Sequence, residues 1–521
     1  MIHPNDTSKP TTTLADGQHT PWRVFTDGGA VHVDWDNEAP LTPHGQLPFF
    51  AEYLHVSERF SQWAGDCPLS YTSNNAPEPE DVLGTLMLSV LCGHTRYSHI
   101  DSIRGDGVSP EVLGINKLVS SDSARRAFAK VEAEAAETWQ LKHLRQTYEA
   151  LLCNPYILDV DVSVVPLYGH QEGAEKGYNP SKPGRPSHAY HIYFIGNLRI
   201  VLDVEVKPGN QTAGCYSRPG IFRLLDVLPE RLWPSFLRGD VGYGNNPMMQ
   251  ACEERGLSYL FKLPQNSTVK TLIKRVAADP AGWTEAGNGW QGRESTFKMD
   301  AWSEKRRVIL LRRVHTDNKR QSGAKSPALT DKKQGEFTFV EAIEQGAHRY
   351  EYAVLVTDLE QPILTIAQLY RDRADCENVI DELKNQWGCS GFTTQDLART
   401  QIMARLVCQV YNWWNVYCRL AIPEKHAEAL TSRPFLWETI GRLVRSAGQR
   451  LIRLSSVDAR AEQAKQLMGE ISAFLQSLRS TAPQLSAETR WSRILSHAFR
   501  AFLGHKQLLA QSAGAQGLLG I

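Results

Sequence analysis

The stretch that decides the fold is YRDRADCENVIDELKNQWG, residues 370–388, which has the composition of a charged helix. It holds five carboxylates, which are Asp372, Asp375, Glu377, Asp381 and Glu382. At about 100° per residue, an ideal helix places Glu377 on one narrow face with three other polar residues. These are Tyr370, Arg373 and Lys384. Geometry therefore selects Glu377 as the carboxylate flanked by cations, with Asp381 close enough to remain a competitor.

An apolar stripe runs beside this polar face. It consists of Cys376, Val379, Ile380, Leu383 and Trp387. Amphipathic helices bury such a stripe against the rest of the protein, so we expect this helix to pack on a sheet. Asp375 and Glu382 point away from the polar face, and we expect their replacement by alanine to be mild.

Two further segments supply aspartates to strands. The alternating, β-branched segment ILDVDVSVV, residues 157–165, predicts a strand with Asp159 and Asp161 on one face. The segment LRGDVGYG, residues 237–244, places Asp240 at the end of another strand. Hard divalent cations take oxygen ligands. Asp161, Asp240 and Glu377 could meet at one sheet edge and hold two Mg²⁺ or Mn²⁺ ions, an arrangement suited to in-line displacement at phosphorus.

The elements between residues 151 and 263 follow the order three strands, helix, strand, helix, strand, which predicts an α/β fold with a mixed sheet. A basic, tryptophan-containing and partly β stretch follows, and then one more strand, the charged helix and a helical remainder. We divide the chain into a disordered arm (1–20), a mainly helical region (21–150), an α/β domain in two parts (151–263 and 347–400), a basic β-rich insertion (264–346) and a C-terminal helical region (401–521). In the second region a short helix, a turn and a helix that opens with Arg125 and Arg126 permit a helix-turn-helix, which would make it DNA-binding.

Charge is unevenly distributed although the net charge is zero. Residues 1–150 hold 11 Lys/Arg against 20 Asp/Glu, residues 262–333 hold 16 against 7, and residues 371–521 hold 19 against 13. Segregation of this kind suits a protein that meets a polyanion with some surfaces only. We therefore expect the insertion to contact the DNA backbone, through Lys305, Arg306 and Arg307 in particular.

Several classes of protein are disfavoured by the sequence. The nine cysteines form no C-x-x-C pair, which favours reduced thiols and a cytoplasmic protein. There is no secretory signal, no apolar run long enough to cross a bilayer, no H-E-x-x-H zinc motif and no P-loop.

The spacing Tyr370-x-x-Arg373-x-x-x-Glu377-x-x-x-x-x-x-Lys384 resembles the Y-R-E-K signature of bacterial DDE insertion-sequence transposases. Together with residues 159–188 and 237–244, it is similar to the insertion-sequence families numbered four and thirteen-eighty. The resemblance runs from roughly residue 81 to residue 505, with three motif blocks in order.

The resemblance implies an RNase H-like catalytic domain with a mostly β insertion before the third acid. It implies Mg²⁺-dependent cleavage and strand transfer by Asp161, Asp240 and Glu377, which are also the metal ligands. It makes Tyr370, Arg373 and Lys384 DNA contacts. The partners it implies are double-stranded transposon-end DNA and target DNA, bound by a homodimer, with no membrane.

Some members of these families hold a flipped base with a tryptophan of the insertion, for which Trp283, Trp290 and Trp302 are candidates here. Two departures from the pattern stand out. The first acid is followed by Val162-Ser163 in place of the usual D-x-T, so Asp159 remains a rival to Asp161. Val241 replaces the serine of the common R-G-D-S-G block, although Asp240 itself is retained.

Two functional classes stay open at this point. The first is an active cut-and-paste transposase that binds the terminal inverted repeats of its own element. The second is a catalytically silent protein on the same fold that binds DNA ends without cutting them. A nuclease of this fold without strand transfer is a third, weaker alternative.

Overall fold

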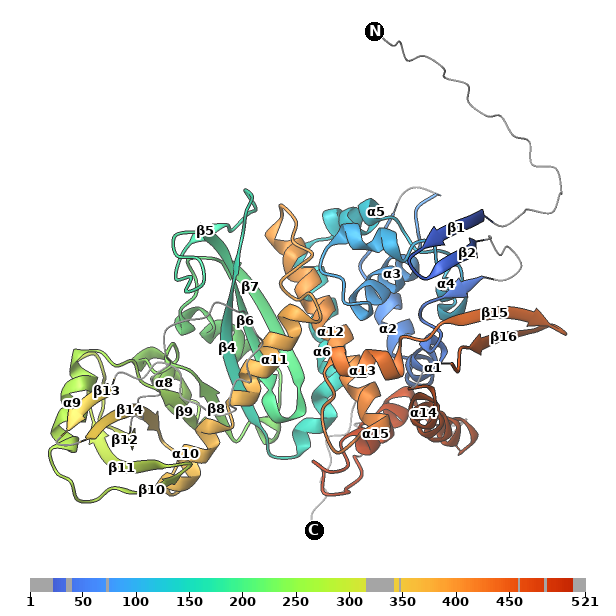
Figure 1. Ribbon diagram of the computed structural model, residues 1–521. Coiled ribbons are helices and arrows are strands. Elements are labelled where there is room, and N and C mark those ends of the chain that lie inside the picture. Colours follow the sequence, from blue (N-terminus) through green and yellow to red (C-terminus); the bar gives the residue numbers. More distant parts are fainter. Residues whose placement is uncertain are drawn as a thin grey trace, which may run out of the picture.

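A computed structural model describes residues 22–33, 40–71, 75–314, 342–345, 348–457, 460–481 and 485–508 (Figure 1). The arm predicted at residues 1–20 lies outside these ranges. Within them, no helix combines the length and the apolar character that crossing a membrane would need.

The N-terminal part is mainly helical, as predicted. It opens with the hairpin β1 (Trp22–Thr26) and β2 (Gly29–Val33) and the short strand β3 (Leu41–Thr42). Its α-helices are α1 (Leu47–Ser57), α2 (Arg59–Gly65), α3 (Pro79–Leu91), α4 (Val108–Leu113), α5 (Ser121–Arg126) and α6 (Ala133–Tyr148). Ser120 caps α5 by accepting a hydrogen bond from the backbone N–H of Ser123.

A mixed sheet lies at the centre of the chain, in agreement with the predicted α/β class. Its strands here are β4 (Ile157–Pro166), β5 (Glu175–Lys176), β6 (Pro186–Ile195), β7 (Ile200–Pro208), β8 (Phe236–Gly239) and β9 (Tyr259–Lys262). The strands β7, β6 and β4 are antiparallel neighbours, and β8 and β9 continue parallel to β4. The helices α7 (Arg218–Asp226) and α8 (Asn246–Glu253) connect the strands along the chain.

The predicted insertion extends this same sheet. β9 pairs antiparallel with β14 (His348–Thr357), and β14 pairs with β12 (Arg306–Val314) and with β13 (Ala342–Gln345). β11 (Trp290–Phe297) and β10 (Thr284–Gly287) follow outward, and α9 (Ser267–Ala277) is the insertion's helix. The strands of the basic stretch therefore belong to the same hydrogen-bonded sheet as the strands that carry the aspartates.

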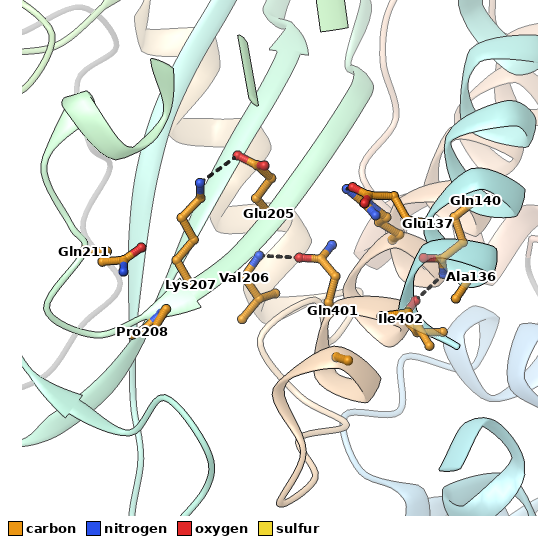
Figure 2. A pocket seen from close by; sticks show the side chains of 13 residues that line it. Ala136, Glu137, Gln140, Glu205, Val206, Lys207, Pro208, Gln211, Gln401 and Ile402 are labelled. Atoms are coloured by element: carbon orange, nitrogen blue, oxygen red, sulfur yellow. Dashed lines mark hydrogen bonds and ion pairs between the residues drawn. The ribbon is translucent and has the colours of Figure 1, made fainter. Parts of the chain in front are cut away.

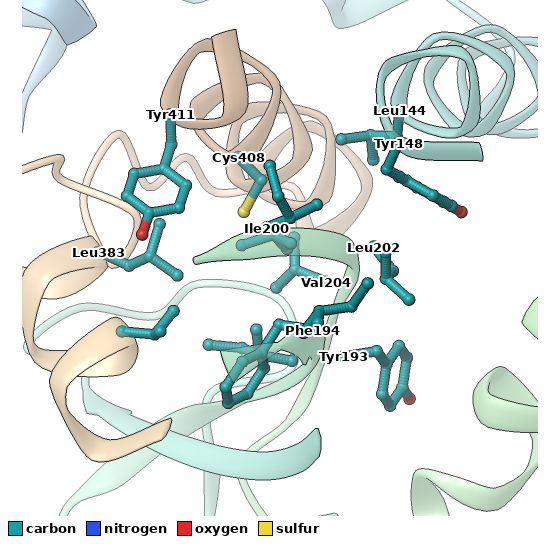
Figure 3. Packing of buried hydrophobic residues seen from close by; sticks show 14 of the residues in the cluster. Leu144, Tyr148, Tyr193, Phe194, Ile200, Leu202, Val204, Leu383, Cys408 and Tyr411 are labelled. Carbon is teal, nitrogen blue, oxygen red and sulfur yellow. The ribbon is translucent and has the colours of Figure 1, made fainter. Parts of the chain in front are cut away.

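The main core lies between the sheet and three helices (Figure 3). Cys408 and Tyr411 of α12 (Leu397–Ala421), Leu383 of α11 (Ala374–Asn385) and Leu144 of α6 pack over residues of β6 and β7. The stripe predicted on the charged helix is confirmed, because its members are buried apart from the half-buried Ile380. Asn412 of α12 is buried too, and its side-chain amide bonds the backbone N–H and C=O of Val201 at 2.9 and 2.7 Å.

The C-terminal region is less helical than predicted. α13 (Ala429–Leu436), α14 (Ala461–Thr481) and α15 (Ala487–Ala498) flank a β-hairpin formed by β15 (Gly441–Ser446) and β16 (Gln449–Leu454). The helical prediction is wrong there because Ala447 and Gly448 both have positive φ values, 49° and 76°, which build a two-residue hairpin turn.

One buried ion pair fixes how β4 and β8 sit against each other. Arg238 of β8 donates to both carboxylate oxygens of Asp159, with distances of 2.6 and 2.9 Å, and both side chains are almost fully buried. A third donor atom of Arg238 bonds the backbone C=O of Leu369. Burial acts to lower the pKa of Arg238, but the Asp159 charge outweighs it and holds that pKa above its usual value. Asp159, the rival first acid, is therefore held by a structural partner.

We expect Asp159→Ala to lower the free energy of unfolding by about 3–5 kcal/mol, because it leaves a buried guanidinium without its partner. The matched control is Asp226→Ala, which breaks a 2.7 Å pair with Arg255 on the surface and should cost at most about 1 kcal/mol. Urea denaturation of both variants measures the difference. Equal losses in the two would contradict the structural role of Asp159.

Candidate active site

The strand register places two aspartates side by side. β4 and β8 run parallel, with Asp159 opposite Arg238 and Val160 opposite Gly239. Continued by one residue, this register sets Asp161 opposite Asp240, where neighbouring strands are about 4.8 Å apart. Asp240 also closes its own turn, because its carboxylate accepts from the backbone N–H of Gly242 at 2.9 Å. Two carboxylates thus lie next to each other where β8 ends.

The charged stretch is two helices and not one. α10 (Ile363–Arg371) ends with Asp372 as its C-cap, and α11 (Ala374–Asn385) begins after its N-cap, Arg373. At this junction the backbone N–H of Arg373 bonds the C=O of Tyr370, and that of Cys376 bonds the C=O of Arg373. These are i→i−3 bonds, which wind the chain more tightly than an α-helix. The ideal-helix projection therefore fails across residues 372–373.

The break changes how the four signature residues are exposed. Tyr370 and Arg373 are 7% and 8% exposed and point into the protein, whereas Glu377 in the first turn of α11 is exposed and Lys384 is half-buried. The prediction that all four share one narrow face of a single helix is therefore wrong. Glu377 still lies in an early turn of a helix that follows directly from Arg373.

Arg373 joins the helices to the strands. Its guanidinium lies 2.7 Å from Oδ2 of Asp161. Burial raises the pKa of Asp161 to about 6; the Arg373 charge opposes that rise, while the charges of Asp240 and Glu377 add to it. The charges of Asp240, Glu377 and Arg373 therefore all act on the Asp161 carboxylate.

Lys262 is a fourth charged residue at this edge, and sequence reasoning missed it. In the β8–β9 register Gly239 is opposite Phe261, so the next step sets Asp240 opposite Lys262. Lys262 is 4% exposed, and burial lowers its pKa to about 8; Arg373 lowers it further, while Asp240 and Glu377 raise it. The sequence does hold a signal, which is a single lysine at the end of the apolar strand LSYLFK. A lysine in a buried strand is itself buried, and a buried cation needs anions nearby.

Comparison with known proteins assigns the family. The family model described as "Transposase DDE domain group 1" matches residues 70–476. The chain belongs to this DDE transposase family. No curated protein matches the chain. A solved structure, the cryo-EM structure of a piggyBac transposase synaptic complex with hairpin DNA, matches with 12% identity over 92% of this chain and 90% of that chain, at a TM-score of 0.33.

The matched residues include all three motif blocks. The match does not identify the insertion-sequence families numbered four and thirteen-eighty, so that part of the prediction is not confirmed. It also leaves the individual roles of the site residues as predictions. Family members generally use a divalent metal, so the fit of such an ion to this chain is the next question.

Carboxylate oxygens are suitable ligands for a hard cation, but in this structure the carboxylates are not arranged around a single point where an ion would bind. Within the ranges that the structure describes, no group of three His, Cys, Asp or Glu residues is gathered closely enough to hold a metal ion. Asp161 and Asp240 supply carboxylate oxygens from adjacent strands, as Mg²⁺ and Mn²⁺ require. Oδ2 of Asp161 is engaged by Arg373, so a metal ion would have to compete with this arginine for that oxygen.

Two of the three basic residues expected to contact DNA are engaged within the protein. Arg306 is 5% exposed and pairs with Glu253 at 2.6 Å. Arg307 pairs with Glu294 at 2.6 Å and also bonds the backbone C=O groups of Leu359 and Gln361. Lys305 is exposed. A triple alanine variant would therefore disturb the insertion itself, and the DNA-contact role of these residues stays a prediction.

The insertion tryptophans proposed to hold a base are not free rings on the surface. Trp290 and Trp302 are 1% and 4% exposed. Trp283 is half-buried, and the guanidinium of Arg312 stacks on it at 4.0 Å. Holding a flipped base with any of the three would require the insertion to rearrange.

A cavity of about 320 Å³ lies away from these acids, between α6, β7 and the start of α12 (Figure 2). Its charged side chains are already matched, since Glu205 lies 3.3 Å from Lys207 and Arg405 lies 3.1 Å from Glu137. Gln401 fixes β7 to α12 by accepting from the backbone N–H of Val206. The cavity is thus a gap between packed elements, and we do not propose it as a binding or catalytic site.

The structure also corrects the choice of neutral positions on α11. Glu382, expected to tolerate alanine, is 1% exposed and accepts from His426 at 2.7 Å and from the backbone N–H of Ala429 at 3.2 Å. Its loss would leave buried donors unpaired. Asp375 is 45% exposed, with a 3.7 Å contact to Arg199, and remains the suitable control on this helix.

We expect Lys262→Met to reduce cleavage of bound DNA by about 10²-fold, because an ammonium group beside the carboxylates can stabilise charge on the phosphate during the reaction. Lys262→Arg should recover part of that rate. Because Lys262 lies among acids, its loss can be accompanied by a lower melting temperature, so thermal melting is used to choose an assay temperature at which the variant is fully folded. Cleavage at the normal rate by a folded Lys262→Met protein would exclude Lys262 from the reaction.

Proposed function

We propose that this protein is a metal-dependent DNA transposase that binds the terminal inverted repeats of its element, cleaves the DNA strands and transfers them to a target. The observation that carries the proposal is the register that sets Asp161 beside Asp240, within a chain of the DDE transposase family. The strand order β7-β6-β4-β8-β9, with β7, β6 and β4 antiparallel and β8 and β9 parallel to β4, supports an RNase H-like catalytic domain.

In this proposal Asp161, Asp240 and Glu377 hold the metal. When bound, Mg²⁺ or Mn²⁺ supplies positive charge that stabilises the scissile phosphate and orients the attacking and leaving oxygens. Arg373 holds the Asp161 carboxylate in place from the helix side. Lys262 adds a second fixed positive charge on the strand side. The phosphate would thus meet preorganised charges on both sides of the two aspartates.

Glu377 and Lys384 are the signature residues that remain accessible to DNA. They are about 10 Å apart along α11, at roughly 1.5 Å per residue, which is more than the spacing of one phosphate along a strand. Lys384 can therefore contact the backbone while Glu377 lies at the reacting phosphate. Tyr370 and Arg373 are buried, so in this proposal they do not contact DNA directly, and Arg373 acts through the position of Asp161.

The alternative is a silent protein that binds DNA ends without cutting them. Loss of function in such a copy would be expected to remove one of the acids or its support. All three acids are present, and the buried pair of Asp159 with Arg238 that aligns the two strands is intact. These features favour the active enzyme.

We expect Asp161→Asn, Asp240→Asn and Glu377→Gln each to abolish cleavage of a terminal-repeat duplex, by at least about 10³-fold, while DNA binding is retained. The reason is that each change removes a charged metal ligand without altering size. Asp375→Asn is the matched control on α11 and should cleave normally. Gel analysis with Mg²⁺ and then Mn²⁺ measures cleavage, and a mobility shift measures binding.

Three outcomes of this experiment separate the alternatives. A wild-type protein that binds but does not cut would indicate the silent protein. Cleavage without joining to a target duplex would indicate a nuclease. Normal cleavage by Asp161→Asn in a folded protein would remove Asp161 from the site altogether.

A further inference from the structure

The hairpin of β15 and β16 is the most unusual surface feature in the C-terminal region. Its base is fixed to the body, because Gly441 and Arg442 pair with Thr42 and Leu41 of β3. The N–H of Leu443 also bonds the C=O of Pro40, and beyond this residue β15 pairs with β16 alone. The tip of the ribbon projects at the right of Figure 1. The two-residue turn at Ala447 and Gly448 makes its tip narrow.

The charge on this hairpin has one sign. The segment GRLVRSAGQRLIRL, residues 441–454, holds four arginines and no acidic residue. The strand register sets Arg445 opposite Arg450 and Arg442 opposite Arg453, so like charges face each other across the ribbon twice. Such pairs destabilise a hairpin. A hairpin with this pairing therefore needs negative charge nearby, from the protein or from a ligand, to offset the repulsion.

The two arginines nearest the tip share a single carboxylate of the body. Arg445 lies 2.8 Å from Glu111 of α4, and Arg450 lies 3.8 Å from the same side chain. Both remain largely in solvent, at 73% and 65% exposed, and Arg453 is exposed as well. One acid cannot neutralise these cations, so a surplus of positive charge projects from the ribbon.

We propose that the β15–β16 hairpin is a DNA-binding ribbon that contacts duplex DNA away from the carboxylate site. This rests on the proposed function for the nature of its ligand. The major groove of duplex DNA, about 12 Å wide, admits a two-stranded β-ribbon. Arginine guanidinium groups match phosphate geometry and the edge of guanine. The polyanion would also remove the repulsion between the paired arginines.

The exposed apolar side chains on the ribbon are few and do not form an alternative interface. Leu451 and Leu454 are 45% and 38% exposed, while Leu443 is 4% exposed and packs against the body. Charge is therefore the dominant property of the projecting part, and it selects a polyanion over an apolar protein partner.

The test compares Arg445→Gln/Arg450→Gln with Arg231→Gln/Arg255→Gln, which removes two exposed arginines elsewhere in the otherwise intact chain. Binding to a terminal-repeat duplex, to an unrelated duplex of equal length and to a single strand is measured from 50 to 300 mM salt. We expect the hairpin variant to bind both duplexes at least about tenfold more weakly. Its log–log salt slope should fall by about 1.8, because each phosphate that the protein no longer binds lowers the slope by roughly 0.9.

The same variant distinguishes this inference from the proposed function. At saturating DNA it should cleave at the wild-type rate. Its melting temperature without DNA should be nearly unchanged, because the variant removes the repulsion between two arginines together with their exposed ion pairs to Glu111, and exposed ion pairs contribute little to stability. Weakening on the terminal repeat alone would mean that the ribbon reads sequence there, whereas equal weakening on both duplexes would mean that it contacts the backbone. Unchanged affinity and slope, or equal losses in the Arg231→Gln/Arg255→Gln control, would overturn the inference whether or not the protein cleaves DNA.

Discussion

The site depends on one buried arginine. Arg238 lies in β8, pairs with Asp159 of β4 and bonds the backbone C=O of Leu369 near the end of α10. These bonds fix three elements at a single point. Two residues further along each strand come Asp161 and Asp240, and four residues after Leu369 comes Arg373, which bonds Asp161. The carboxylates are aligned because the pair beneath them allows only one register.

A second constraint is electrostatic. Acids and cations lie close together at this edge, where Asp161, Asp240 and Glu377 interact electrostatically with Arg373 or Lys262. Buried charges are tolerated only when they are paired. Each cation therefore stabilises the folded state by neutralising an acid. An entering metal ion must displace a cation from a carboxylate, and an entering phosphate must displace a carboxylate from a cation. Folding and chemistry use the same charges here.

The sequence predicted the strands, the order of the elements and the buried stripe of α11, because alternation and helical periodicity are local signals. The roles of Asp161, Asp240 and Glu377 stay predictions. The sequence did not predict the helix break at Asp372–Arg373, because no glycine or proline there signals the i→i−3 hydrogen bonds. It also did not predict that Glu382 is buried against His426, because His426 lies 44 residues away in the sequence. Lys262 was missed because its role depends on strand register. The β15–β16 hairpin was missed because its turn uses alanine at a positive φ, which few sequences do.

The most direct test of this account is a crystal structure of the protein bound to a terminal-repeat duplex and soaked in Mn²⁺, with the metal located by its anomalous scattering. We predict a peak bonded to the carboxylates of both Asp161 and Asp240, with Arg373 displaced from Oδ2 of Asp161 and Asp159 still paired with Arg238. A peak bonded to Asp159, or metal bound elsewhere while Arg373 stays on Asp161, would contradict the account.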